Sequence, residues 1–403
     1  MIKKGDDNGV FDRFRAGFPA FENQTYLSIC DRMILHDEVR QAVEIFLTHL
    51  AMATENRVGH ERQVAEARAK FAELMNVEEP TIAAIRNVSD GVNSVAWSLN
   101  WQTGDNVVLT AESEHPNNVY PWLRLKKRGV NVRLVPPTRE AAIDVAAMID
   151  AIDSRTRAVS VASATFAPGH RTDLYALGEA CAKRDVLLIV DGVQTAGILK
   201  HDLGAERVGA FITSTSKGLL GLYGFGFLYV SPEWIDRMEP AYLSRAAILH
   251  AQDDHSAMGG FDYRYQPGSR RFEVGSFNLA GAYAANRSLD LLLELGIQKI
   301  ESRVLELAAA FHGGLEECGL APAVPGRGPL HSHIVTLGRV DAGGHGFSDD
   351  PLVEPLSEHL AAHKVAHTIR RGQLRFGFHA YNNREDVETA LAVIREGIRE
   401  IKN

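Results

Sequence analysis

The sequence predicts an α/β protein with a mostly parallel sheet, and three observations support this. Short β-branched runs alternate with amphipathic helical stretches along most of the 403-residue chain. A chain of this length is too long to fold around one ordinary hydrophobic core, so we expect two or three packed sub-domains. Hydrophobic residues make up 45% and charged residues 23% of the sequence, which is the profile of a soluble globular protein.

The elements of the expected large domain follow in order. Strands are predicted at 81–85, 106–110, 131–135, 157–163 and 186–190, with helices near 91–99, 121–127, 140–152 and 173–184. Near residue 210 the pattern changes, because strands 210–214 and 224–230 leave no room for a crossover helix between them. That spacing predicts at least one antiparallel pairing at the edge of the sheet.

The second half of the chain predicts a smaller unit. Polar, glycine-rich segment 244–275 reads as a long loop, and a long helix is expected from 278 to about 318. Strand 333–337, helix 352–363, strand 373–379 and helix 384–401 then predict a small α/β C-terminal domain, partnered by segment 20–70. We therefore expect an N-terminal segment 1–70 at the active-site entrance, a large domain 71–290 and a small domain 291–403.

Composition limits the partners and the compartment. The net charge is −8, from 43 basic and 51 acidic residues, which predicts no general nucleic-acid surface. Cys30, Cys181 and Cys318 are too widely spaced for a disulfide framework or a cysteine metal site, and no metal is expected. The N-terminus lacks the apolar segment of a secretion signal, and no apolar stretch is long enough to cross a bilayer. A cytoplasmic protein without membrane partners is expected.

Two residues at predicted strand ends carry the functional prediction, because ligands of parallel α/β sheets bind there. Asp191 follows strand 186–190, where a buried carboxylate is costly unless a cation faces it. Lys217 follows strand 210–214 in STSKGLLGLYGFG, and a lysine in a dry pocket can be an amine nucleophile. Alone, the first could be a turn residue and the second a solvated lysine. Together they match what pyridoxal phosphate requires: a carboxylate for the pyridine nitrogen and a lysine that forms a Schiff base.

Two further stretches suit anionic groups. Segment 87–91 lies at a strand-to-helix turn, where free N–H groups and the helix dipole can hold a phosphate. Ser89 also fits a helix N-cap, and both roles are compatible. Arg375 lies in strand 373–379 and could clamp a carboxylate with two hydrogen bonds, or be an ordinary strand arginine. The roles of nearby Arg370 and Arg371 stay open.

Segments DGVQTAG (191–197) and STSKGLLGLYGFGFLYV (214–230) resemble the class V aminotransferase and cysteine desulfurase family of pyridoxal phosphate enzymes. Similar segments occur in the family's order at 86–96, 114–122, 270–281 and 374–387, so the resemblance covers most of residues 25–395. It implies the aspartate aminotransferase-like fold (fold type I), with a large domain on a mixed, mostly parallel sheet and a small α/β C-terminal domain. It also implies pyridoxal 5′-phosphate as the cofactor.

The resemblance implies a role for each matching residue. Lys217 forms the Schiff base, Asp191 pairs with the pyridinium nitrogen, and His115 stacks on the ring and relays protons. Gln194 binds the ring 3′-oxygen, and Arg375 binds the α-carboxylate of a small amino-acid substrate. The phosphate ligands implied are Ser89, Asp90, Ser214, Ser216 and, across a homodimer with shared active sites, Ser276. Ser216 stands where the family often has histidine.

The reaction type stays open between several alternatives. Persulfide-forming desulfurases need a cysteine on the loop before the substrate arginine, and no cysteine follows Cys318 or is expected near the arginine strand. DGVQ resembles the desulfurase, lyase and epimerase branch, and NVSDGVNSVA resembles isopenicillin N epimerase-like members. We therefore expect Cα deprotonation leading to β-elimination or epimerisation, with transamination as the alternative. A non-catalytic member is disfavoured by the intact set of Lys217, Asp191, His115 and Arg375.

The expected entrance segment departs from the family. Asp31 and Arg32 replace small residues, His36 replaces a proline, and Phe166 stands where desulfurases often have asparagine. Charge at the entrance predicts a substrate with a polar or charged side chain, while the individual roles of Asp31 and Arg32 stay open.

Overall fold

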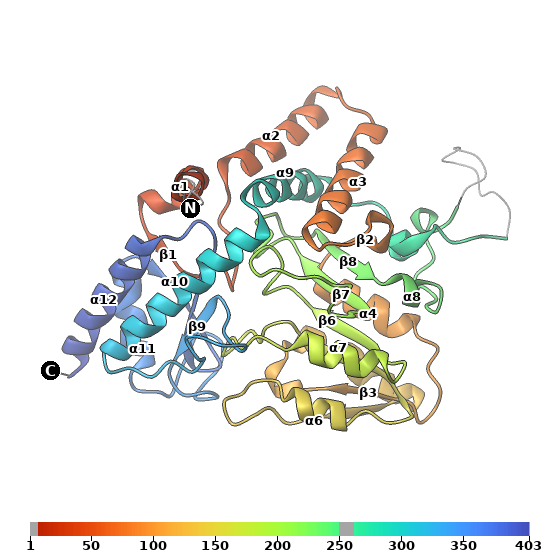
Figure 1. Cartoon of the computed structure of the whole chain (residues 1–403). Coiled ribbons are helices and arrows are strands. Elements are labelled where there is room, and N and C mark those ends of the chain that lie inside the picture. The colour runs from red at the N-terminus through yellow and green to blue at the C-terminus, as the bar shows by residue number, and fades with distance from the viewer. Residues whose placement is uncertain (1–6, 250–261, 403) are drawn as a thin grey trace, which may run out of the picture.

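The main sheet of the computed structural model, which describes residues 7–249 and 262–402, has seven strands in the order β2-β8-β7-β6-β5-β3-β4 (Figure 1). Their bounds are β2 Ile82–Ile85, β3 Asn106–Leu109, β4 Asn131–Leu134, β5 Thr156–Ala162, β6 Leu187–Asp191, β7 Ala210–Ser214 and β8 Gly226–Val230. Strands β4, β3, β5, β6 and β7 pair in parallel, and β8 runs antiparallel to both β7 and β2. The predicted antiparallel pairing is confirmed, although β8 lies inside the sheet because β2 forms the edge.

Helices cover both faces of this sheet, which is why its central strands are buried along their whole length. Successive residues of β6 point to opposite faces: Leu188 and Val190 join one core, and Leu187 and Ile189 join the other. The covering helices are α4 Val88–Ser98, α5 Tyr120–Leu125, α6 Val145–Asp150, α7 Leu174–Ala182 and α8 Pro232–Ile235. Helices α4, α5 and α8 contribute to one core, and α7 contributes to the other.

The single long helix expected from 278 to about 318 is wrong, because two helices occupy this stretch. Helix α9 spans Leu279–Leu295 and α10 spans Ile297–Glu317. Gly296 separates them with a φ of +81°, a conformation that costs glycine little and other residues much more. The bend lets α10 leave the large domain and run diagonally to the smaller one (Figure 1).

The small domain contains a three-stranded antiparallel sheet in the order β11-β12-β9. Its elements are β9 Ile334–Leu337, α11 Val353–Ala362, β10 Val365–Ala366, β11 Thr368–Arg370, β12 Gln373–Gly377 and α12 Arg384–Lys402. Near the N-terminus, β1 (Thr25–Tyr26) pairs in parallel with β10, and Ser28 bridges to Gly377. Residues 28–33 therefore run beside the strand that holds Arg375.

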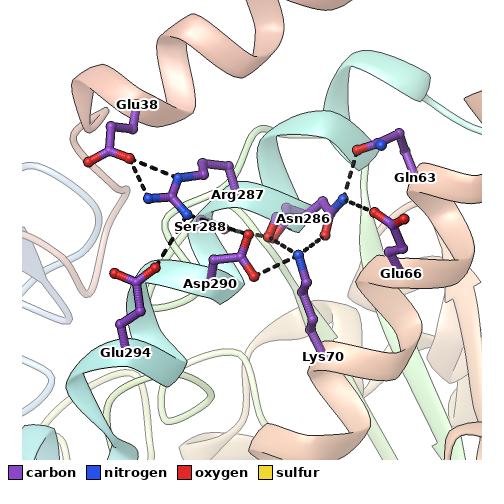
Figure 2. Close-up of polar contacts among 10 residues, drawn as sticks. Glu38, Gln63, Glu66, Lys70, Asn286, Arg287, Ser288, Asp290 and Glu294 are labelled. Atoms are coloured by element: carbon purple, nitrogen blue, oxygen red, sulfur yellow. Dashed lines mark hydrogen bonds and ion pairs between the residues drawn. The ribbon is translucent and has the colours of Figure 1, made fainter.

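The remaining N-terminal helices are α1 Asp7–Ala16, α2 Asp37–Met52 and α3 Arg57–Leu74, and α2 and α3 pack against α9 of the large domain. Polar contacts reinforce this packing (Figure 2). The Arg287 guanidinium donates to Glu38 of α2 at 2.9 Å, and Lys70 of α3 forms an ion pair with Asp290 at 2.6 Å. The N-terminal segment thus contacts both domains, through its helices and through β1.

The stretch expected to be a loop, 244–275, falls partly within residues 250–261, outside the described residues. Its described parts contain two short 3-10 turns, Arg245–Ala247 and Gly268–Phe272. Across residues 7–249 and 262–402, none of the helices combines the length and apolar character needed to span a bilayer.

Candidate active site

The ends of β6 and β7 meet the small domain and the N-terminal segment at one place. The loop after β7 holds Lys217, and it is attached on two sides. The backbone N–H of Met33 donates to Ser216 O at 3.0 Å, and His379 Nε2 lies 2.9 Å from Gly218 O. Three parts of the chain that are distant in sequence therefore fix the position of Lys217.

Two glycines bring the loops after β6 and β7 into direct contact. A Cβ on Gly197 would lie 2.4 Å from Gly218 O, and a Cβ on Gly218 would lie 2.4 Å from Ala196 O. Gly197 also has a φ of +81°. Because no side chain fits between the two backbones, the loop after Asp191 is held against the loop of Lys217.

Asp191 is the last residue of β6 and is buried. Its Oδ1 accepts a hydrogen bond from Val193 N–H at 3.0 Å. Burial raises the pKa of Asp191 to about 6, although this hydrogen bond and the Lys217 charge oppose the shift. The carboxyl group is thus a buried acceptor that gains from a cationic N–H donor.

Lys217 is partly buried in the same region. Desolvation lowers the pKa of Lys217 to about 8; the Arg375 charge adds to this shift, and Asp191, Cys30 and Asp31 oppose it. With that pKa, about one amine in ten is neutral at pH 7, against about one in several thousand for an ordinary lysine. The chain therefore provides a reactive amine next to a buried carboxylate.

His115 begins a short 3-10 turn, Pro116–Asn118, after β3. Its Nδ1 accepts from Asn117 N–H at 3.2 Å, so the proton of the neutral ring is on Nε2. The ring also meets Phe166 edge to face, with centroids 5.8 Å apart. The side chain is exposed on one side, but the atoms packed around it and the charges of Lys217, Arg370 and Arg375 lower its pKa.

Glu114 belongs to this site although the sequence predicted no role for it. Its buried carboxyl group accepts from Asn118 Nδ2 and from Ala162 N–H, each at 2.7 Å. Burial raises the pKa of Glu114 to about 8, and the negative charge of Asp191 adds to the shift. The contacts fasten the His115 turn to the end of β5.

Segment 87–91 lies at the start of α4 as predicted, but Asn87 rather than Ser89 is the N-cap. The Asn87 side chain accepts from Asp90 N–H at 3.0 Å. The Asp90 carboxylate pairs with Arg86 through Nη2 at 2.8 Å and Nε at 3.1 Å. Ser89 is partly exposed. Roles for Ser89 and Asp90 in phosphate binding stay predictions.

The other predicted phosphate ligands, Ser214, Ser216 and Ser276, differ in their surroundings. The hydroxyls of Ser214 and Ser216 are 3.1 Å apart on the Lys217 loop, and both residues are buried. Ser276 is exposed and has a φ of +48°. Its role towards a second subunit stays a prediction.

Arg375 lies in β12 with only 2% of its surface exposed, so it is no ordinary surface arginine. Nε donates to Thr368 Oγ1 at 3.1 Å, and one Nη donates to Phe166 O at 2.8 Å. The second Nη is 3.9 Å from Asp31 Oδ1. Backbone and hydroxyl contacts thus orient the guanidinium and leave one edge towards the site.

The contacts of Asp31 show how Arg370 and Arg375, two of the three neighbouring arginines, are arranged. Its Oδ1 also accepts from Arg370 Nη2 at 2.5 Å, so one carboxylate lies between two arginines. Burial and the Arg375 charge lower the pKa of Arg370. Arg371 pairs with Asp341 at 2.7 Å and donates to Ala167 O at 3.2 Å.

Two other residues expected at the entrance have different surroundings. Arg32 has an exposed side chain, and its carbonyl accepts from Tyr26 Oη at 2.8 Å. His36 is buried and caps α2 by accepting from Glu38 N–H at 3.1 Å. Asp31, by contrast, pairs with Arg370.

Cys30 contradicts the expectation that no cysteine lies near the arginine strand. It is buried, and a Cβ on Gly377 of β12 would lie 2.9 Å from its Sγ. Its carbonyl accepts from Gln194 Nε2 at 3.2 Å. The sequence could not indicate this, because the contact joins residues more than 340 positions apart.

Two of the buried side chains with unused hydrogen-bonding atoms belong to this region. Among the described residues, Gln194 Oε1 and both ring nitrogens of His333 lack a partner. Burial lowers the pKa of His333 to about 3, with further contributions from His379, Arg375 and Lys217. His333 was missed because one histidine before a strand gives no signal. Unpaired buried atoms of this kind suit a polar ligand.

Comparisons with known proteins identify the family and the fold. The family model "Aminotransferase class-V" matches residues 35–338. A probable cysteine desulfurase of Methanothermobacter thermautotrophicus is 32% identical over 62% of this chain and 61% of its own length. A probable cysteine desulfurase of Pyrococcus abyssi is 28% identical over 84% of each chain.

Among solved structures, the cystine C–S lyase C-DES in complex with its product cysteine persulfide has a TM-score of 0.82 at 21% identity, over 94% of this chain and 99% of the lyase. A lysine-to-alanine mutant of C-DES, with glycine covalently linked to its pyridoxal phosphate cofactor, has a TM-score of 0.83 at 21% identity, over 95% and 99% of the two chains. At that identity the likeness concerns the fold, and it confirms the predicted fold type.

Proposed function

The chain belongs to the aminotransferase class-V family, and on that premise we propose that it is a pyridoxal 5′-phosphate enzyme that breaks a bond at Cβ of an amino acid, with a carbon–sulfur bond as the favoured target. The observation that carries the proposal is the glycine contact that holds the loop after buried Asp191 against the Lys217 loop. The names of the relatives, cysteine desulfurase and cystine C–S lyase, support the carbon–sulfur bond.

The residues present fit the cofactor. Asp191 offers a buried acceptor for the pyridine nitrogen, and the unpaired Gln194 Oε1 offers an acceptor to a ring hydroxyl. Ser214, Ser216 and the start of α4 supply donors for a phosphate. When bound, the cofactor supplies an aldehyde for the substrate amine and an electron sink for charge at Cα.

Lys217 and His115 handle the protons. The lowered pKa of Lys217 leaves part of its amine neutral near pH 8, so that Nζ can accept the Cα proton of the substrate. His115 carries its proton on Nε2, the nitrogen opposite the one fixed by Asn117. Its lowered pKa keeps the ring neutral at pH 7, so Nε2–H can donate a hydrogen bond to a departing group.

Arg375 and Asp31 define the substrate end of the site. Because Phe166 O and Thr368 hold the Arg375 guanidinium, its second Nη is oriented for a carboxylate. Asp31 faces that nitrogen at 3.9 Å and is held by Arg370. A substrate α-carboxylate therefore displaces a weak contact rather than a short ion pair.

Elimination requires no enzyme cysteine. With cysteine as substrate, the Cβ–S bond breaks, and water completes the conversion to pyruvate, ammonium and sulfide. A desulfurase would instead move the sulfur to an enzyme thiol and release alanine. Cys30 Sγ is packed against the backbone of β12, which supports elimination.

Product analysis tests this proposal. Holoenzyme incubated with cysteine and cystine should form pyruvate and ammonium in equal amounts, and Cys30→Ser should retain most of that activity. Cys318→Ser serves as the matched control, because Cys318 lies at the end of α10. Alanine with a persulfide on Cys30 would establish desulfuration instead. Accumulated pyridoxamine phosphate would indicate transamination, and an inverted Cα would indicate epimerisation.

We also propose that the enzyme is a cytoplasmic homodimer with shared active sites. Large apolar side chains are exposed on α2, at Leu50 (56%) and Met52 (67%), and at the start of α3, at Val58 (72%). Exposure of this kind on a soluble protein often marks an interface. Sedimentation of the holoenzyme tests the assembly, since an active monomer would contradict it.

A further inference from the structure

Two histidines lie one helical turn apart where α11 ends, away from the residues assigned to the cofactor. His359 is in the last turn of α11, and His363 is its C-cap residue. Side chains at positions i and i+4 lie on the same side of a helix. The two rings accordingly lie with their centroids 4.3 Å apart.

The hydrogen bonds of both rings fix the same tautomer. Nδ1 of His363 is 2.9 Å from the carbonyl oxygen of His359, and Nδ1 of His359 is 3.1 Å from a carboxylate oxygen of Glu400. Both oxygens can only accept, so each Nδ1 carries a proton. In the neutral rings, each Nε2 then has a lone pair available for a ligand.

His359 Nε2 has no hydrogen-bond partner among the described residues, and it is buried. The whole side chain is only 10% exposed. Its ring packs against α12, where a Cβ on Gly397 would lie 2.9 Å from His359 Cδ2. The buried lone pair of His359 Nε2 therefore lacks a donor, and a bound cation would satisfy it.

Glu396 of α12 completes a cluster of three possible ligands. One ligand atom each from Glu396, His359 and His363 lie within 4.8 Å of one another. A tetrahedral ion with bonds of about 2.1 Å needs ligands roughly 3.4 Å apart. The side chains of Glu396 and His363 are exposed, so rotation about their side-chain bonds can bring the ligand atoms to that shorter separation.

We propose that His359, His363 and Glu396 bind a divalent transition-metal ion of the zinc class between α11 and α12. Two imidazole nitrogens and one carboxylate are ligands of Zn²⁺, whereas Mg²⁺ and Ca²⁺ prefer oxygen alone. Glu400 fits the role of the outer carboxylate that orients a ligating histidine. The ion would join the two helices and stabilise the small domain, since it binds only the folded arrangement.

Titration of the full-length holoenzyme tests the site. After treatment with a chelator, Zn²⁺ is added in a calorimeter, and the melting temperature is followed with and without the ion. We expect one Zn²⁺ per chain, at least about tenfold weaker binding for His359→Gln and His363→Gln, and a similar loss for Glu396→Gln. Zn²⁺ should raise the melting temperature of the wild type but not of these variants, and Mg²⁺ should have no effect.

The matched control is His312→Gln on α10. His312 also has a carboxylate one turn away, Glu316 at 3.5 Å, but it is not part of the three-residue cluster. This variant should bind Zn²⁺ like the wild type. His363 is exposed, so its replacement should leave a folded chain, which circular dichroism and cofactor absorbance verify. Equal Zn²⁺ affinity in the wild type and a folded His359→Gln/His363→Gln variant, or no binding to the wild type, would overturn the proposal.

Discussion

Replacement of Asp191 by asparagine tests the pairing between the buried carboxylate and the cofactor ring. The change keeps the size of the side chain and an oxygen for the Val193 N–H, which now lies at 3.0 Å. It removes the negative charge, and Asp191 is almost fully ionised at pH 8 because its pKa is about 6. The variant should therefore fold and retain cofactor while losing the charged hydrogen bond to the ring nitrogen.

A hydrogen bond to a charged group contributes roughly 1.5–3 kcal/mol. If that contribution is lost from the transition state, kcat falls about 10- to 150-fold. The assay is steady-state pyruvate formation at pH 8, with cofactor content measured by absorbance. Asp185→Asn is the control, because Asp185 is an exposed aspartate paired with Arg237 at 2.7 Å. A kcat within twofold of the wild type, in an Asp191→Asn variant with full cofactor content, would refute the pairing.

Three further changes probe other parts of the account. The pKa of Glu114 is raised to about 8, so between about pH 4.5 and pH 8 the folded wild type holds a proton that the unfolded chain releases, and its free energy of unfolding falls as the pH rises. The Glu114→Gln variant lacks this proton and should therefore become more stable relative to the wild type over that range. An equal difference in the free energy of urea unfolding between the two proteins at pH 5 and pH 8 would contradict this. Gly218→Ala should lower cofactor retention and activity, because its Cβ would lie 2.4 Å from Ala196 O; unchanged activity would show that the loop contact is dispensable. Hybrid dimers of Lys217→Ala and Ser276→Glu subunits should regain about one active site per dimer, and proven hybrids without activity would rule out shared sites.

The sequence predicted the part of the site that depends on strand ends. Asp191 is the last residue of buried strand β6, and Lys217 follows buried strand β7. The carboxyl ends of neighbouring parallel strands lie at the same edge of the sheet. Their proximity therefore follows from local pattern and topology. The same reasoning placed segment 87–91 at the start of α4. The N-cap is Asn87 and not Ser89, and the sequence could not separate them because Asn and Ser are nearly equivalent N-caps.

Contacts between distant segments could not be predicted in this way. Asp31 meets Arg370 only because β1 pairs with β10, and these strands contain two residues each. Cys30 reaches β12 because the neighbouring Ser28 bridges to Gly377. The break at Gly296 was also missed, since apolar residues continue on both sides and one glycine does not by itself end a helix pattern.

The central claim is that Lys217 is the residue to which the cofactor is attached. The most direct measurement is borohydride reduction of the holoenzyme, followed by digestion and mass spectrometry of the peptides. We expect the reduced cofactor on the peptide that contains Lys217, and no protein-bound cofactor in a folded Lys217→Ala variant. Reduced cofactor on another lysine, or equal labelling of the variant, would contradict it.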